Sequence, residues 1–360
     1  EVDRLARQGQ QVLQAAREIR AEEEVVLQHQ RPRPALADDA FGGGDMAEEA
    51  ADLAGRKRLE EGAGVRRGQP RELLRGQDPA VGRLPPLRIA FSDWAGATHA
   101  TMERMLRLLG ERRPAVRADF DEADLLIYSD FGERHWDFKG WKVYLTGENM
   151  VPDFRQCDLA YSPVEIPGDP RAVRLPYYAQ VLPGLGSLVR PAGHDPEALL
   201  DRPGFACFVA SNPRGRERNR FFRALHRRRP LVSAGRHFNT TGRPLADKMD
   251  LLRGFRFNLA FENTRSPGYV TEKLVEPLLA GAIPIYWGAP DVDREFDPGC
   301  MIDVSRFPDE RAAIEHVLAV DADRGLRRAL LAAPPFRGNR PPACLSDEYL
   351  AARRAARGAA

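Results

Sequence analysis

The chain has 360 residues, enough for about two domains, and its 43% hydrophobic and 29% charged residues are typical of a globular protein. Its 54 basic and 52 acidic residues leave a net charge of +2, which excludes a strong overall attraction to nucleic acid or to an anionic membrane. The sequence contains no run of about 18 apolar residues, so the composition predicts no membrane-spanning helix.

The first 85 residues differ in composition from the rest of the chain. They contain a single aromatic residue, Phe41, among many Glu, Arg, Gln, Gly and Ala residues. Such a segment buries too little apolar surface to offset the entropy lost on ordering. We therefore predict that residues 1–85 form a disordered extension or arise from a wrong start of translation. A seven-residue spacing of Leu5, Val12, Ile19 and Val26 leaves a short coiled-coil helix as the alternative.

From residue 86 onward, short apolar runs alternate with stretches of helical pattern. The predicted strands cover residues 87–91, 124–128, 142–145, 205–210, 257–261 and 283–287. The predicted helices cover residues 100–111, 217–228 and 271–280. Residues 163–203 are rich in Pro and Gly and predict a long linking region. Because strands that alternate with helices form parallel sheets with right-handed crossovers, we predict an α/β protein with two Rossmann-like domains facing a cleft, at 86–190 and 200–345.

Ligands of such sheets bind beyond the carboxyl ends of the strands, which makes the residues after each strand candidates for a site. Glu148 follows the strand at 142–145 and Gly147, whose backbone can turn sharply. A carboxylate in this place can serve as a general base, or it can cap a helix and accept backbone N–H bonds. Both interpretations of Glu148 stay open.

The predicted helix at 271–280 carries a positive charge in its first turn, where the helix dipole disfavours one. Thr271 is a good N-cap and Glu272 suits the positive end of the helix dipole. Lys273 opposes that dipole, which is easier to explain if an anion such as phosphate binds there. The alternative is a lysine that is simply solvated on an exposed face.

Arginines gather around the predicted helix at 217–228, with Glu217 as the one acidic residue among them. They are Arg214, Arg216, Arg218, Arg220, Arg223, Arg227, Arg228 and Arg229. Guanidinium groups suit phosphate oxygens, and a first helical turn offers free N–H groups to the same anion. A solvated basic face and a nucleic-acid-binding surface are the alternatives.

One pair of acidic residues is a candidate metal site. Asp291 and Asp293 resemble the acidic pair that holds a divalent metal in many sugar transferases, but Asp is also common in tight turns.

The four cysteines, Cys157, Cys207, Cys300 and Cys344, are far apart, which indicates a reducing compartment. We expect a cytoplasmic protein. Its basic tail at 346–360 could contact the inner membrane peripherally, and this alternative stays open.

Several sequence blocks between residues 86 and 340 resemble glycosyltransferase family 10, the α-1,3/4-fucosyltransferases, and are most similar to its bacterial members. They are YLTGEN at 144–149, FVASNP at 208–213, FNLAFENT at 257–264, GYVTEKL at 268–274 and LAGAIPIYWGAP at 279–290. The resemblance implies a GT-B fold in which the C-terminal domain binds GDP-fucose. It also implies an inverting transfer that forms an α-fucosyl linkage to a glycan hydroxyl, at O3 of GlcNAc or Glc or at O4.

The resemblance further implies roles for individual residues. Glu148 matches the general base of the family, and Arg218 and Lys273 match positions that contact the diphosphate. Tyr269, Glu272 and Asn263 fall on the nucleotide-sugar side. We assign Glu148 and Glu272 as catalytic residues, and the donor-binding residues are Arg218, Lys273, Tyr269, Asn263, Glu262, Asn212 and Ser211. No metal or other cofactor is expected; another donor such as GDP-mannose stays open, as does the oligomeric state.

Overall fold

The computed structural model describes residues 85–94, 114–182 and 184–346, all within one compact unit, Gln69–Ala360. The predicted extension up to residue 84, the predicted helix at 100–111 and the tail from residue 347 lie outside the described residues.

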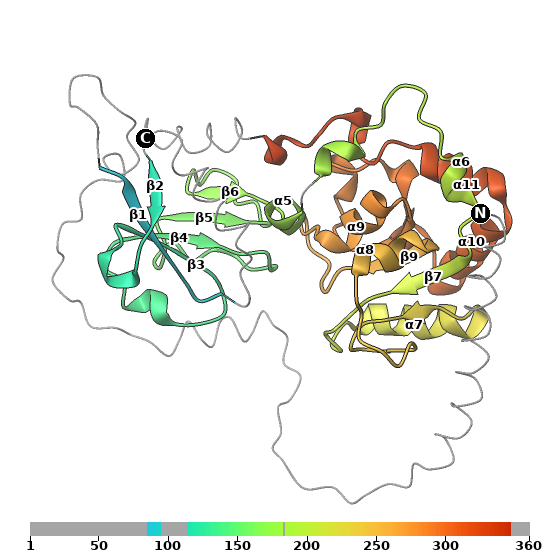
Figure 1. Ribbon diagram of the computed structural model, residues 1–360, viewed down its shortest axis with the longest axis horizontal. Helices are drawn as coiled ribbons and strands as arrows, with labels where there is room; N and C mark the ends of the chain where they lie inside the picture. Colours follow the sequence, from blue (N-terminus) through green and yellow to red (C-terminus); the bar gives the residue numbers. More distant parts are fainter. Residues whose placement is uncertain (1–84, 95–113, 183, 347–360) are drawn as a thin grey trace, which may run out of the picture. The chain divides into compact units, whose positions relative to one another are not determined.

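The first half of this unit is built on a sheet of six parallel strands in the order β2-β1-β3-β4-β5-β6 (Figure 1). The strands are β1 (Leu87–Ser92), β2 (Ala115–Arg117), β3 (Leu125–Tyr128), β4 (Trp141–Leu145), β5 (Leu159–Ser162) and β6 (Ala172–Arg174). Strands β3, β4 and β5 are buried along their whole length. They therefore consist almost entirely of apolar residues, as expected for a parallel sheet covered on both faces.

The second half contains a sheet of five parallel strands in the order β11-β10-β9-β7-β8. The strands are β7 (Gly204–Phe208), β8 (Val232–Ser233), β9 (Phe255–Phe261), β10 (Ile283–Trp287) and β11 (Ile302–Asp303). The helices of this half are α6 (Glu197–Leu200), α7 (Arg216–Arg228), α8 (Lys248–Arg253), α9 (Glu272–Ala280), α10 (Glu310–Ala322) and α11 (Arg324–Ala332).

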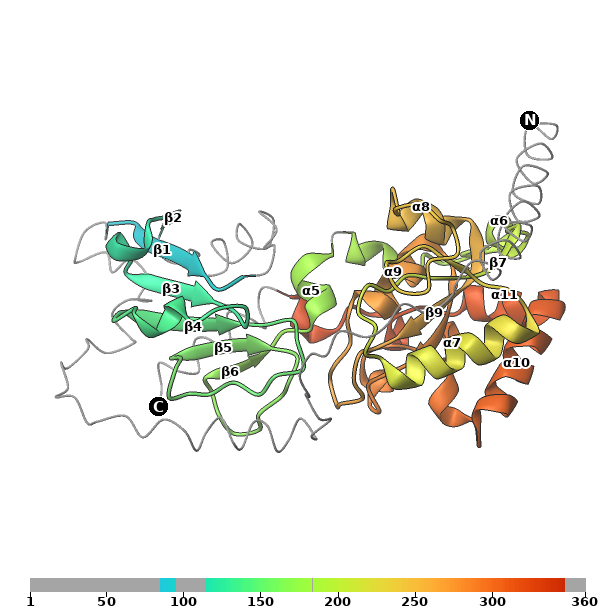
Figure 2. The same ribbon diagram turned by 90° about the horizontal axis from the view of Figure 1, so that it is seen from below.

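The strand order of the second sheet reverses between the neighbouring strands β7 and β9. From β7 the chain passes through α7 to the edge strand β8, and from β9 it passes through α9 to β10 on the other side. Right-handed crossovers in opposite directions place α7 and α9 on opposite faces of the sheet, as Figure 2 shows. A crevice at the carboxyl ends of β7 and β9 is therefore where a nucleotide is expected to bind.

The largest hydrophobic cluster joins the two halves of the unit. It contains Val143 of β4, Tyr178 of the helix α5 (Tyr177–Val181), and Leu274 of α9. Helix α5 packs against α9, so the loop that follows β4 and the start of α9 belong to one packed region. Glu148 follows β4 and Lys273 lies in the first turn of α9, and the two residues interact electrostatically.

Most predicted elements are confirmed where the structure describes them, including the six strands, the helices α7 and α9, and the parallel arrangement. The stretch 163–203, predicted as a long linking region, contains the regular elements β6, α5 and α6, which the sequence prediction missed. Strand β6 is only three residues long and ends in a charged residue, so it shows no periodic pattern. The sequence prediction also missed the short strands β2, β5, β8 and β11.

In the described part of the chain, no helix combines the length and the apolar composition that crossing a bilayer requires.

Candidate active site

Glu148 lies in a loop that is anchored by the carboxylate of Asp130. Its backbone N–H donates to the hydroxyl oxygen of Thr146 at 3.0 Å. The Thr146 hydroxyl in turn donates to one carboxylate oxygen of Asp130, and the Tyr144 hydroxyl donates to the other. Asp130 follows β3, the neighbour of β4, so adjacent strand ends supply both the acid and its support. The sequence analysis missed Asp130, although its position after a predicted strand was the available signal.

The glycine before Glu148 is required for space. A Cβ atom at Gly147 would lie 2.1 Å from Cδ2 of Tyr177, so the aromatic ring packs directly on the glycine backbone. Tyr177 is the first residue of α5, and its hydroxyl interacts electrostatically with Glu272, Lys273 and Glu148. Tyr177 therefore lies near both candidate catalytic carboxylates, and nothing in the sequence pattern indicated this.

The carboxyl group of Glu148 has an environment suited to accepting a proton. The side chain is exposed, yet the surrounding protein atoms raise its pKa by desolvation. Lys273 lowers the pKa, Asp130 and Glu272 raise it, and a hydrogen bond from the Tyr269 hydroxyl lowers it. The net effect is a pKa above the ordinary value for Glu, which makes Glu148 a better base than a fully solvated carboxylate.

Glu262 holds the start of α9 through hydrogen bonds to Thr271. Its side chain is fully buried at the end of β9, and burial raises its pKa to about 6. One of its oxygens accepts from the Thr271 N–H at 2.8 Å and the other from the Thr271 hydroxyl at 2.7 Å. Thr271 is the N-cap of α9, as predicted, and its hydroxyl accepts from the Lys273 backbone N–H. Glu262, predicted to bind the donor, is thus occupied with positioning Thr271.

Lys273 extends between two carboxylates. Its Nζ atom lies 3.3 Å from Oε1 of Glu272 and 3.7 Å from Oε2 of Glu262. Burial opposes the positive charge, but the two carboxylates outweigh burial and raise the pKa of Lys273. Burial likewise opposes ionisation of Glu272, but Lys273 and Lys248 outweigh it and lower the pKa of Glu272. The structure therefore brings Glu148, Tyr269, Glu272 and Lys273 together in one charged cluster.

Arg218 is a buried cation with no acidic partner among the described residues. It lies in the first turn of α7 and is 2% exposed. One Nη atom donates to the Asn263 amide oxygen at 3.1 Å, the other donates to the Asn212 carbonyl oxygen, and Nε has no partner. Burial alone lowers the pKa of this guanidinium, and no neighbouring charge opposes it. A buried, unpaired charge is costly unless an anion completes the site.

The remaining predicted donor-binding residues lie at the same strand ends. Ser211 and Asn212 are exposed after β7, and the Asn212 amide oxygen accepts from the Arg214 N–H. Asn263 is half-buried after β9 and contacts Arg218 across the crevice between the two strands. No direct contact joins Arg218 to Lys273 in the part of the chain that the structure describes. Instead they lie on α7 and α9, the two helices that begin at the crevice.

Other candidates from the sequence have partners of their own. Asp291 accepts from the Gly268 N–H and contacts Arg294, and Asp293 contacts Arg306. Within the described ranges there is no group of three or more potential metal ligands.

Several arginines of the basic segment also bind acids of the same chain. Arg220 pairs with Glu217 and Glu310, Arg228 with Glu315, and Arg229 with Asp321. These ion pairs reduce the positive charge that the segment can offer to nucleic-acid phosphates.

The pH dependence of catalysis should respond in opposite directions to two substitutions beside Glu148. A general base acts in its unprotonated form, so kcat/KM rises with pH through the pKa of Glu148. Asp130→Asn removes a charge that raises this pKa, so the acid limb should move to lower pH. Tyr269→Phe removes a hydrogen bond that lowers it, so the limb should move to higher pH. Shifts in the same direction would contradict the assignment of Glu148.

Two family models match consecutive parts of the chain. The model described as alpha-(1,3)-fucosyltransferase FucT N-terminal domain matches residues 89–181. The model described as glycosyltransferase family 10 (fucosyltransferase) C-term matches residues 200–328. Together they cover more than half of the chain and include every predicted site residue.

Individual proteins show the same similarity. The alpha-(1,3)-fucosyltransferase FucT of Helicobacter pylori is 30% identical over 272 residues, which cover 65% of this chain and 57% of that relative. This chain therefore spans less than two thirds of the relative's length. A putative fucosyltransferase, R654, of Acanthamoeba polyphaga mimivirus is 35% identical over 88 residues, 24% of this chain and 15% of the relative.

Solved structures agree on the fold. A crystal structure of an alpha1,3-fucosyltransferase with GDP-fucose has a TM-score of 0.61 and 25% identity, covering 79% of this chain and 94% of that one. A crystal structure of an alpha1,3-fucosyltransferase with GDP has a TM-score of 0.60 and 27% identity, covering 79% and 93%. With the two parallel sheets, this likeness confirms the predicted fold of two Rossmann-like domains of the GT-B type.

Proposed function

Because this chain belongs to glycosyltransferase family 10, we propose that it transfers fucose from GDP-fucose to a hydroxyl group of a glycan, with inversion at the anomeric carbon. The observation that supports this most strongly is the pair of helix N-termini at the crevice of the second sheet. One carries the buried, unpaired Arg218, and the other carries Lys273 next to the carboxylates Glu148 and Glu272.

In the proposed reaction, Glu148 accepts the proton of the acceptor hydroxyl as that oxygen attacks the anomeric carbon. General base assistance of this kind contributes about 10² to 10⁴ in rate. The bond from the anomeric carbon to GDP breaks, and the leaving diphosphate gains negative charge. Arg218, Lys273 and the N–H groups of the first helical turns offset this charge, so the proposed mechanism requires no metal ion. Glu272 stabilises the cationic sugar or holds its hydroxyl groups.

Lys273 should matter for the phosphates and not for the base or ribose. In Lys273→Ala, the carboxylates Glu262 and Glu272 would face a bound diphosphate without the cation between them. We therefore expect the Kd for GDP to rise at least about tenfold and the Kd for guanosine to change little, since a charge-assisted contact contributes about 1.5–3 kcal/mol. Lys139→Ala is a matched control, because Lys139 is exposed in the first half of the unit and is outside the charged cluster. Calorimetric titration measures both ligands, and equal weakening would refute the phosphate role.

The function itself is tested by incubating the chain with GDP-fucose on a glycan array, with GDP-mannose in a parallel series. We expect fucose on acceptors that offer O3 of GlcNAc or Glc, or O4, and no comparable transfer of mannose. Transfer from GDP-mannose alone would favour the alternative donor. Failure to bind any nucleotide sugar would refute the proposal.

A further inference from the structure

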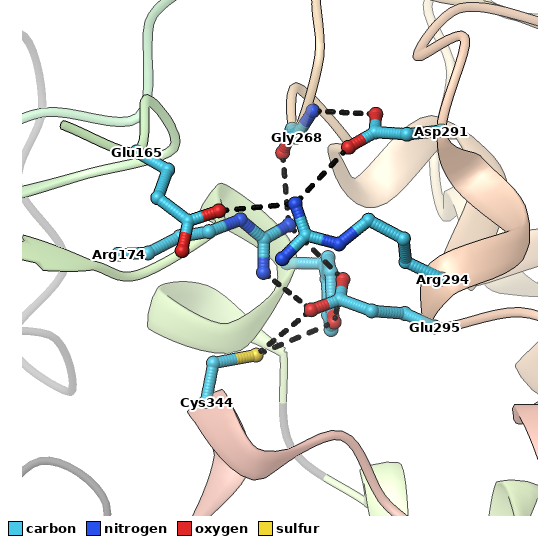
Figure 3. A network of polar contacts seen from close by, with 8 residues as sticks. Glu165, Arg174, Gly268, Asp291, Arg294, Glu295 and Cys344 are labelled. Carbon is cyan, nitrogen blue, oxygen red and sulfur yellow. Dashed lines mark hydrogen bonds and ion pairs between the residues drawn. The ribbon is translucent and has the colours of Figure 1, made fainter. Parts of the chain in front are cut away.

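A buried ion pair connects the last residue of β6 to the second sheet. Arg174 is 8% exposed and donates through both Nη atoms to the carboxylate of Glu295, which is 14% exposed (Figure 3). Glu295 follows the short 3-10 helix Val292–Arg294 and also accepts from the Tyr178 hydroxyl at 3.1 Å. The thiol of Cys344 donates to its other oxygen at 3.6 Å. The carboxylate is thus held by three side chains from separate segments.

The same guanidinium holds the backbone of a loop in the candidate active site. One Nη atom of Arg174 donates to the Gly268 carbonyl oxygen at 3.1 Å. The Gly268 N–H donates to Oδ1 of Asp291 at 2.7 Å, so Gly268 is held on both sides (Figure 3). Arg294 contacts the other oxygen of Asp291 and also Glu165, which follows β5. Two connections therefore join the first sheet to this loop: the hydrogen bond from Arg174, and the ion pairs of Arg294 with Glu165 and with Asp291, which accepts from Gly268.

Gly268 is the residue that permits this close approach. Its φ angle is +74°, which a residue with a side chain rarely adopts. A Cβ atom there would lie 2.9 Å from the Pro163 carbonyl oxygen and 3.0 Å from Nε of Arg174. The carbonyl oxygen can therefore reach the guanidinium only because residue 268 lacks a side chain.

The loop that begins at Gly268 carries the groups that face Glu148. Tyr269 follows directly and donates its hydroxyl to Glu148, and Thr271, Glu272 and Lys273 form the start of α9. Glu148 itself follows β4, two strands from β6 in the same sheet. The position of Gly268 relative to β6 therefore determines how the Tyr269–Lys273 segment lies relative to the base.

We propose that Arg174 is a positioning residue that holds the Gly268–Lys273 segment at the separation from Glu148 that fucosyl transfer needs. This inference rests on the proposed function and extends it to a residue that touches neither substrate. Buried ion pairs contribute little net stability on average, because desolvation offsets their attraction. A geometric role accounts for the bond to the Gly268 carbonyl, which stability alone does not require. A displacement of about 1 Å in an active site can lower a rate about a hundredfold.

The test compares Arg174→Lys and Arg174→Ala with Arg171→Ala in the full chain. Lysine keeps the charge but cannot donate to Glu295 in bidentate fashion and to Gly268 at once. Arg171 is a suitable control because its ion pair with Asp169 is local and its side chain is 43% exposed. The measurements are kcat with saturating GDP-fucose, the Kd for GDP, the pH profile, and hydrogen exchange of residues 268–275 in the free protein.

We expect kcat to fall at least about tenfold in Arg174→Lys and about a hundredfold in Arg174→Ala. The Kd for GDP should rise less than in Lys273→Ala, because Lys273 keeps its charge and its contact with Glu272. Amide hydrogen exchange should become faster in residues 268–275. The acid limb of kcat/KM should move to higher pH, because the hydrogen bond from Tyr269 to Glu148 weakens. A kcat and an exchange pattern like those of Arg171→Ala would overturn the inference. So would faster exchange throughout the protein, since that indicates a purely structural role.

The outcome also separates this inference from the proposed function. If the unaltered chain transferred no fucose, the proposed function would fail by itself. The exchange measurement would still show whether Arg174 holds the segment, and unchanged exchange there would overturn the positioning role independently.

Discussion

Replacing Glu148 with Gln is expected to lower the rate of fucose transfer at least about a hundredfold and to leave the Kd for GDP unchanged. Glutamine has nearly the same shape as glutamate and can still accept the hydrogen bond from Tyr269. It cannot take a proton from the acceptor hydroxyl at neutral pH. The loss should therefore appear in kcat and kcat/KM together, because an interaction of the transition state is removed.

A single-turnover assay with saturating GDP-fucose measures this effect without a contribution from product release. Glu133→Gln is the matched control, because Glu133 is an exposed carboxylate in the same half of the unit and is outside the charged cluster. We expect the control to transfer fucose at the rate of the unaltered chain. Turnover by Glu148→Gln within about threefold of that rate would eliminate Glu148 as the base.

The second large effect is expected at Arg218. Since the guanidinium is buried without an acid beside it, a bound diphosphate would be its counter-ion. Hydrogen bonds to charged groups contribute about 1.5–3 kcal/mol each, so Arg218→Ala should raise the Kd for GDP about a hundredfold. Arg218→Lys should raise it at least about tenfold, because lysine cannot donate in two directions from one plane.

The free protein should tolerate these changes. Removing one member of a buried ion pair usually leaves an uncompensated charge, but Arg218 has no charged partner among the described residues. The Tm without ligand should therefore stay within a few degrees of that of the unaltered chain, and only the stabilisation by GDP should disappear. Arg220→Ala is the control, because Arg220 lies two residues further in α7 and its ion pairs are on the surface. A large fall in Tm with unchanged GDP affinity would show that Arg218 is structural.

The sequence predicted most of the elements that carry the site. Buried parallel strands are nearly continuous apolar runs, and the residues after β4, β7 and β9 include Glu148, Asn212 and Asn263 of the candidate site. Thr271 as the N-cap followed from residue type alone. The orientation of a side chain at a strand end did not follow: Glu262, predicted to bind the donor, is fully buried and bonds to Thr271.

What the sequence did not predict depends on contacts between distant segments. Strand β6 has three residues and no detectable period, and so Arg174, its last residue, was placed in a linking region. Tyr177 lies against Gly147, and the spacing of the two residues in the sequence does not reveal this contact. The absence of an acid beside Arg218 is a property of the folded chain, and a list of neighbouring arginines cannot show which of them is buried.

A crystal structure of the chain with GDP-fucose would test the central claim most directly. We predict that the diphosphate contacts both the Arg218 guanidinium and the Lys273 ammonium group. The anomeric carbon should face Glu148 on the side opposite the phosphate. A diphosphate bound away from either cation, or a sugar whose anomeric carbon is turned away from Glu148, would contradict the proposed mechanism.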